Sequence, residues 1–170
     1  MLSLTKGIKQ LYNIQNYTFS EVAAIMDEEK LKSIRDEYLT RSDKVDYSLD
    51  LPEAETNVML ALWRGEGPYN TSKVMKLIGE HKGWKPSTLI SFLSRLEEKG
   101  FIMSYKDGKE RFYIPLAEKE IYVKRLTEKF VSKYHGNSLS SLLDSVYSDR
   151  DFSDDDIDEL IAWLETRRVR

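Results

Sequence analysis

Three hydroxyl groups and one guanidinium lie on one side of the segment 86–99, which the hydrophobic spacing predicts to be a helix. They belong to Ser87, Thr88, Ser91 and Arg95. The opposite side carries apolar residues at i, i+3, i+4 and i+7, namely Leu89, Phe92, Leu93 and Leu96. Hydroxyls and a guanidinium suit a core poorly, but they hydrogen-bond well to base edges in a groove of nucleic acid. The pattern therefore favours recognition of nucleic acid by this helix.

Two further helices are predicted ahead of this segment. Residues 51–64 open with Pro52, which suits a first helical turn, and carry Val58, Met59, Leu62 and Trp63 at helical spacing. The next helix is expected to start at Asn70, a good N-cap, to bury Val74, Leu77 and Ile78, and to end before Gly83. Together the three segments predict a helix-turn-helix on a scaffold helix.

A hairpin is predicted after the third helix. Strands over 101–106 and 109–115 flank Asp107-Gly108, a dipeptide that suits a type I′ turn. We interpret the hairpin as a wing, with basic residues near its tip and before the helix that are candidates for phosphate contacts: Lys106, Lys109, Arg111 and Lys85. An ordinary solvated hairpin end explains the basic residues at the tip equally well.

Beyond residue 116 the pattern predicts three amphipathic helices, the last opened by a capping box of Ser153 and Asp156. Their apolar faces predict self-association, whereas the alternative is packing on the preceding domain. The candidate dimerisation residues are Leu126, Phe130, Leu139, Leu142, Leu143, Val146, Ile157, Leu160, Ile161 and Leu164.

The first 50 residues are expected to form a helical extension. Thr18 and Glu21 make a capping-box pattern, and apolar residues continue from Val22 to about Leu39, ahead of a linker at 43–50. A helix that packs on a neighbour is favoured over a second small helix-turn-helix. A protein partner that binds through residues 1–50 is a further option.

Composition narrows the function classes. The chain has no cysteine and only two histidines, which excludes disulfides and thiolate metal sites, and no cofactor or metal is expected. No apolar run is long enough for a membrane span, so we expect a cytoplasmic protein that binds no membrane. Residues 51–116 hold ten Lys/Arg against eight Asp/Glu, whereas both flanking segments are acidic. This small excess supports nucleic-acid binding only weakly.

An enzyme is not expected. The candidate carboxylate pairs, such as Glu97-Glu98 and the acids at 154–156, are sequence neighbours, and neighbours on a helix point to different faces. His81 and His135 stand near predicted helix ends, where histidine usually interacts with the helix dipole. Trp84 is interpreted as an anchor of the helix-turn-helix core.

From about residue 51 onward, the chain resembles the penicillinase repressor and methicillin-resistance repressor family (BlaI/MecI/CopY). The matching stretches are Glu53 to Met59 with Leu62 and Trp63, Trp84 to Thr88, Leu93 to Gly100, Phe112 to Pro115, and Phe152 to Ile157. The resemblance implies a mainly α fold with a small β wing, consisting of a winged helix-turn-helix domain at 51–116 and a three-helix dimerisation domain at 117–170. It also implies a homodimeric repressor on a palindromic operator in double-stranded DNA, with contact positions at Ser87, Thr88 and Arg95.

Two departures from the family pattern stand out. Glu97 and Glu98 replace the usual lysines before Gly100, which should weaken phosphate attraction. Where the lactam-responsive branch is cut at an Asn-Phe bond, this chain has Ser145-Val146, so the inducing signal is open. The second hypothesis is therefore a winged-helix protein-interaction adaptor that no longer reads DNA specifically.

Overall fold

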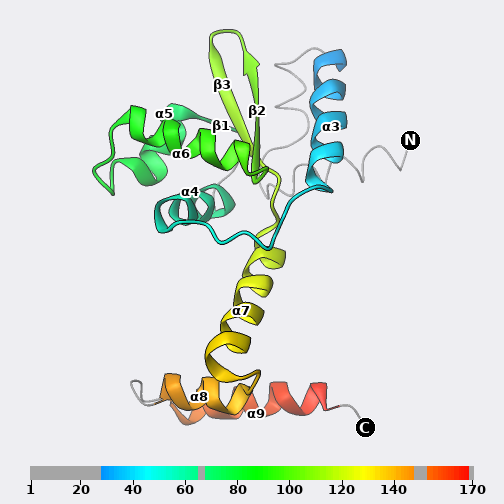
Figure 1. Cartoon of the computed structure of the whole chain (residues 1–170), viewed down its shortest axis with the longest axis vertical. Coiled ribbons are helices and arrows are strands. Elements are labelled where there is room, and N and C mark those ends of the chain that lie inside the picture. Colours follow the sequence, from blue (N-terminus) through cyan, green and yellow to red (C-terminus); the bar gives the residue numbers. More distant parts are fainter. Residues whose placement is uncertain (1–27, 65–67, 148–152, 169–170) are drawn as a thin grey trace. The chain divides into compact units, whose positions relative to one another are not determined.

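The computed structural model describes residues 28–64, 68–147 and 153–168. These residues are mainly helical, with one three-stranded antiparallel sheet (Figure 1), so the predicted fold class is confirmed. The chain forms two compact units, Met1–Val123 and Lys124–Arg170. The domain boundaries expected at residues 50 and 116 stay a prediction.

The scaffold helix α4 spans Glu53–Arg64 and follows Pro52 as predicted. Val58, Met59 and Leu62 are buried because their spacing places them on one side of the helix. Trp63 packs at the edge of the same core and donates from its indole Nε1 to the carbonyl of Ala117 at 2.8 Å. The next two helices pack against this side of α4.

The second helix begins as predicted, but it does not stay α-helical. The Asn70 side chain caps α5 (Thr71–Val74) by accepting from the Lys73 backbone N–H at 2.9 Å. The chain then forms the π-helical turn η1 (Met75–Gly79), in which the Glu80 N–H donates to the Met75 carbonyl. Since a π turn widens the helix, the 3.6-residue spacing no longer holds. The predicted burial of Leu77 was wrong, because this side chain is exposed.

Helix α6 spans Pro86–Glu98 and buries Leu89, Leu93 and Leu96, as the spacing predicted, whereas Phe92 on the same side is half-buried. Its end is a Schellman motif. The N–H of Gly100, which has a φ of +75°, donates to the Glu97 carbonyl, and the N–H of Phe101 donates to the Leu96 carbonyl. The C-terminal end of α6 is therefore fixed by local sequence, and Pro86 stands in its first turn.

The sheet contains β1 (Tyr69–Asn70), β2 (Ile102–Asp107) and β3 (Glu110–Pro115) in the order β1-β3-β2. The short strand β1 was not predicted, because two residues carry no alternation to detect. The predicted loop Asp107-Gly108 was wrong by one residue, since Asp107 pairs with Glu110 and the loop is Gly108-Lys109. Gly108 has a φ of +57° and Lys109 has no positive φ, which is typical of a type II′ turn.

The N-terminal extension contributes helix α3 (Glu28–Ser42), which lies along β2 in Figure 1. Ile34 is buried in a cluster with Met103 of β2, Ile114 of β3 and Leu116, which follows β3. Burial raises the pKa of the Tyr38 hydroxyl, and the Glu118 carboxylate adds to the rise. The described part of the extension thus packs on the sheet, which agrees with the favoured alternative of a packing helix. The expected capping box at Thr18 and the apolar residues from Val22 to Met26 lie outside the described residues.

The predicted linker at 43–50 has no helix or strand, as expected, and neither do the next two residues, but the stretch is packed. The Tyr47 hydroxyl accepts from the Glu118 N–H at 2.9 Å, and the Tyr122 hydroxyl accepts from the Leu51 N–H at 3.3 Å. These bonds join the linker to the start of α7 (Lys119–His135). The linker therefore has a fixed path over its own unit.

The second unit contains the remainder of α7, helix α8 (Leu139–Tyr147) and helix α9 (Asp154–Arg167), as predicted. The capping box at the start of α9 is confirmed, and hydrogen bonds from Ser153 lower the pKa of Asp156. Neither α8 nor α9 has a buried residue. Over the described ranges, no helix is both long and apolar enough to cross a membrane.

Ile34→Ala should lower the free energy of unfolding of the first unit by about 2–5 kcal/mol, because it leaves a cavity between α3 and the sheet. Urea unfolding of the full chain measures this change. Leu39→Ala is the matched control, since Leu39 lies on the same helix but is 48% exposed, and it should change stability by less than about 0.5 kcal/mol. Equal small effects of both variants would show that α3 does not stabilise the sheet.

Candidate nucleic-acid interface

The outward side of α6 presents hydrogen-bonding groups, as the sequence predicted. Ser87, Ser91 and Arg95 are exposed, whereas Thr88 is half-buried at the margin. The Ser91 hydroxyl donates to the Ser87 carbonyl at 3.0 Å, which leaves its oxygen as an acceptor. Because the three buried leucines fix the rotation of α6, these side chains face away from the core together.

Ile90 and Ser94 were missed by the sequence analysis. Both are exposed on the same side of α6, and the run 87, 90, 91 and 94 follows i, i+3, i+4 and i+7. Ile90 is 45% exposed, which is unusual for a large aliphatic side chain in the middle of a polar face. The same helical spacing that located the core would have found both residues, had it been applied to the outer side.

Arg95 is exposed, yet its guanidinium is held on several sides. Nη1 lies 3.6 Å from Oε1 of Glu55, and Nε donates to the Ser91 carbonyl at 3.3 Å. The guanidinium carbon also lies 5.1 Å from the centre of the Phe92 ring, a cation–π distance. Arg95 therefore has a defined orientation on the surface of the helix.

The wing carries the predicted basic residues, but they differ in their partners. Lys106 and Lys109 are exposed near the loop. Arg111, in contrast, donates to the Ser104 hydroxyl at 2.7 Å and lies 3.8 Å from the Glu97 carboxylate. Its charge is therefore already engaged within the protein.

Glu97 has a role that the sequence did not reveal. Its Oε1 accepts from the Ser104 N–H at 3.0 Å and from the Ser104 hydroxyl at 2.7 Å, so it joins the end of α6 to β2. We expected Glu97 to weaken phosphate attraction, but Arg111 lies beside it and offsets its charge. Only Glu98 of this acidic pair is exposed.

An ion pair also joins the extension to the end of the wing. The Lys30 ammonium binds the Asp107 carboxylate, next to the loop residues Gly108 and Lys109. Both side chains are about one-third exposed, so the pair contributes little to stability by itself. Its effect is to offset one of the two acids that flank the wing tip, Asp107, whereas the other, Glu110, lies on the opposite strand beside Lys109.

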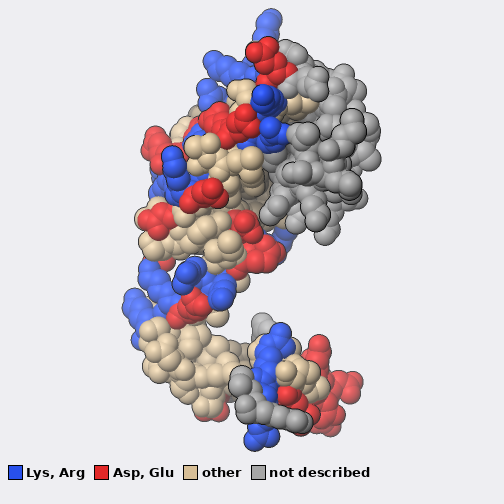
Figure 2. Space-filling view, turned by 90° about the vertical axis from the view of Figure 1, so that its right-hand side faces the viewer, with Lys and Arg blue, Asp and Glu red and all other residues tan. Residues whose placement is uncertain are grey.

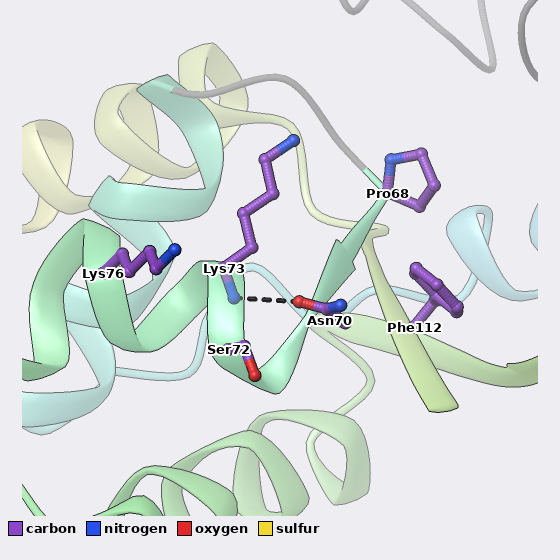
Figure 3. Close-up of a pocket in the computed structure, with 6 residues that line it drawn as sticks. All are labelled: Pro68, Asn70, Ser72, Lys73, Lys76 and Phe112. Carbon is purple, nitrogen blue, oxygen red and sulfur yellow. Dashed lines mark hydrogen bonds between the residues drawn. The ribbon is translucent and has the colours of Figure 1, made fainter. Parts of the chain in front are cut away.

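A hollow of about 370 Å³ lies beside the start of α5 (Figure 3). Lys73 and Lys76 come from the second helix, and Pro68 and Phe112 line it from the other side. These two ammonium groups add to the basic residues near α6, which include Lys85 just before its first turn.

One face of the molecule carries charges of both signs. On the face shown in Figure 2, Lys and Arg side chains are interleaved with Asp and Glu rather than gathered into one field. Within the described ranges, no group of three His, Cys, Asp or Glu residues is arranged to hold a metal ion. The hydrogen-bonding face of α6 and the individual cations around it are groups that can contact nucleic acid.

Comparisons with known proteins point to one family. A model of the penicillinase repressor family matches residues 51–166. The penicillinase repressor of Bacillus licheniformis is 27% identical over 120 residues, which are 71% of this chain and 93% of that protein. The methicillin resistance regulatory protein MecI of Staphylococcus aureus (strain N315) is 29% identical over 111 residues, or 65% of this chain and 89% of that protein.

Among solved structures, a solution structure of the Bacillus licheniformis BlaI monomeric form in complex with the blaP half-operator aligns with a TM-score of 0.37. Its sequence identity is 29%, and the alignment covers 44% of this chain and 89% of that one. The family match begins at residue 51, so helix α3 lies outside it. Because the match extends from the scaffold helix α4 into the last helix α9, this chain belongs to the penicillinase repressor family.

Proposed function

We propose that the protein is a homodimeric transcriptional repressor that binds a palindromic operator, with α6 in the major groove. The observation that carries the proposal is the outward face of α6, which presents hydroxyls and a held guanidinium on a helix whose rotation is fixed by three buried leucines. Membership of a family named for repressors supports it. A protein of this function works on DNA in the cytoplasm and needs no cofactor.

The residues divide into base-reading and phosphate-binding groups. Ser87, Thr88 and Ser91 offer hydroxyls to base edges, and Arg95 offers paired N–H groups that suit guanine. The phosphates are contacted by the flanking cations, which fix the register of α6 but carry no sequence information: Lys85, Lys106, Lys109, Lys73 and Lys76. Arg111 contributes less than predicted from sequence, because Ser104 and Glu97 already hold it.

The boundaries expected from sequence are retained in this proposal. Residues 51–116 form the winged helix-turn-helix domain, 117–170 form the dimerisation domain, and 1–50 form an extension. Helix α3 of the extension supports the sheet of the first domain through Ile34. Helix α3 is therefore assigned to the DNA-binding part of the chain.

The apolar residues of the last three helices support dimerisation. Seven of the ten candidate residues are exposed: Leu126, Phe130, Leu139, Val146, Leu160, Ile161 and Leu164. Leu142, Leu143 and Ile157 are half-buried. Trp163, Tyr134 and Tyr147 add to the exposed apolar surface. Apolar surface on this scale marks an interface, and a second copy of the same helices offers a matching one.

The second candidate function is a protein-interaction adaptor that no longer reads DNA. It is favoured by the pairing of two arginines with acids inside the protein, Arg95 with Glu55 and Arg111 with Glu97. It is also favoured by the mixed charge visible in Figure 2. Binding of duplex DNA separates the two functions.

The repressor function predicts two different effects of two substitutions. Arg95→Ala should weaken binding to an inverted-repeat duplex, selected from a random pool, by about 1–3 kcal/mol, because it removes base contacts. Lys109→Ala should weaken binding to selected and scrambled duplexes alike and reduce the salt slope by about one, because it removes a phosphate contact. Fluorescence anisotropy at several salt concentrations measures both. If the wild type binds no duplex, the adaptor becomes the better hypothesis.

Ile90 should read a thymine methyl group, the one apolar feature of the major groove. Replacing the contacted thymine by deoxyuridine should weaken wild-type binding about fourfold, since one buried methyl-sized group is worth roughly 0.8 kcal/mol. Ile90→Ala should lose this sensitivity, whereas the neighbouring control Ser94→Ala should keep it. A deoxyuridine scan of the half-site that treats wild type and Ile90→Ala alike would remove Ile90 from base reading.

Ile161→Asp should weaken the dimer at least about tenfold, because it places a charge in an apolar interface. Ile161 is 49% exposed, so the substitution should leave each protomer folded. Ser132→Asp, on an exposed part of α7, is the matched control and should leave the dimer unchanged. Sedimentation equilibrium measures both variants, and an unchanged dimer in Ile161→Asp would place the interface elsewhere.

A further inference from the structure

Glu55 is the one charged residue that is buried among the residues the structure describes, with 1% of its surface exposed. It lies in the first turn of α4, where the helix dipole favours a negative charge. It does not belong to the outward face of α6, and the proposed function gives it no role. A buried carboxylate is costly unless it is paired, so its partners are informative.

Both partners of Glu55 belong to the recognition helix or its end. Oε1 lies 3.6 Å from Nη1 of Arg95, and Oε2 accepts from the Lys99 ammonium. The side chain of Arg95 is 51% exposed and that of Lys99 is 30% exposed. Glu55 thus links the scaffold helix α4, within the core, to the exposed guanidinium of Arg95 on α6.

The two cations have different relations to the carboxylate. Lys99 makes the closer contact and covers one oxygen, so the buried charge keeps a partner when Arg95 turns toward another ligand. Arg95 holds the other oxygen by the longer contact. Arg95 is therefore oriented by Glu55, while its exposed side chain can still bind another ligand.

Aromatic rings complete the seat of Arg95. The guanidinium lies over Phe92, and Phe92 packs against Trp84 with ring centres 4.8 Å apart at 65°. Glu55, the Ser91 carbonyl and the Phe92 ring therefore contact the guanidinium from different sides. A long side chain held in this way loses less conformational freedom when it binds.

We propose that Glu55 is a positioning residue that determines sequence specificity through Arg95. The carboxylate holds Nη1 and thereby aims the remaining N–H groups of the guanidinium at the acceptors of one guanine. This inference rests on the proposed function and names how that function selects its sequence. Glu55 also offsets positive charge near the DNA, so it lowers binding to arbitrary sequences while it raises binding to the selected one.

Glu55→Gln tests the inference because the two effects have opposite signs. It should weaken binding to the selected inverted-repeat duplex about tenfold, a normal coupling for contacting residues. Binding to a scrambled duplex should stay equal or become tighter, because one negative charge is lost. Glu98→Gln is the matched control, since it removes the same charge from an exposed position of α6 and should strengthen binding to both duplexes alike.

A double-mutant cycle shows whether Glu55 acts through Arg95. In an Arg95→Gln background, Glu55→Gln should no longer change the ratio of the two affinities. Glu55→Asp keeps the charge but shortens its reach, so it should lose the preference without tighter binding to the scrambled duplex. All variants are compared by anisotropy below the unfolding transition of the least stable one.

Three results separate the outcomes. A wild type that prefers no duplex from the pool overturns the proposed function itself. A wild type with a clear preference, combined with an equal loss for both duplexes in Glu55→Gln, overturns only the positioning role. A loss of preference that persists unchanged in the Arg95→Gln background does the same, because Glu55 then acts without Arg95.

Discussion

Burial of Leu89, Leu93 and Leu96 against the scaffold helix is the contact on which the rest of the structure depends. Three leucines at helical spacing fix the rotation of α6 about its own axis. The polar residues between them must then face away from the core. The wing begins directly after the Schellman motif that ends this helix, so its position follows from the same contact. The polar face is therefore specified by the apolar one.

Electrostatics in this protein are local. Its net charge is −3, which by itself argues against nucleic acid, but several acids near the recognition helix are matched with individual cations. Glu55 pairs with two of them, and Glu97 lies beside Arg111. These pairs lower the long-range attraction to phosphate and leave orientation, rather than total charge, to decide which sequence binds. Such a surface favours selectivity over affinity.

Most of the fold could be predicted from spacing and caps, because both act within one turn of helix. Asn70 and Ser153 begin helices as expected. Leu77 could not be placed, since a π turn changes the period without a sequence signal. The partners of Glu55 and Glu97 could not be predicted either, because they join residues of different elements. Ile90 was within reach of the same spacing rule.

Helix α3 and the wing share one apolar cluster, and this has a consequence in terms of thermodynamic linkage. A ligand or protein that draws α3 away from the sheet must expose Met103 and Ile114. Any DNA that favours the wing in its present place opposes that step. Linkage is reciprocal, so DNA would weaken the binding of such a ligand by the same free energy by which the ligand weakens the binding of DNA. The extension outside the family match thus has a direct physical route by which a signal can reach the DNA-binding surface.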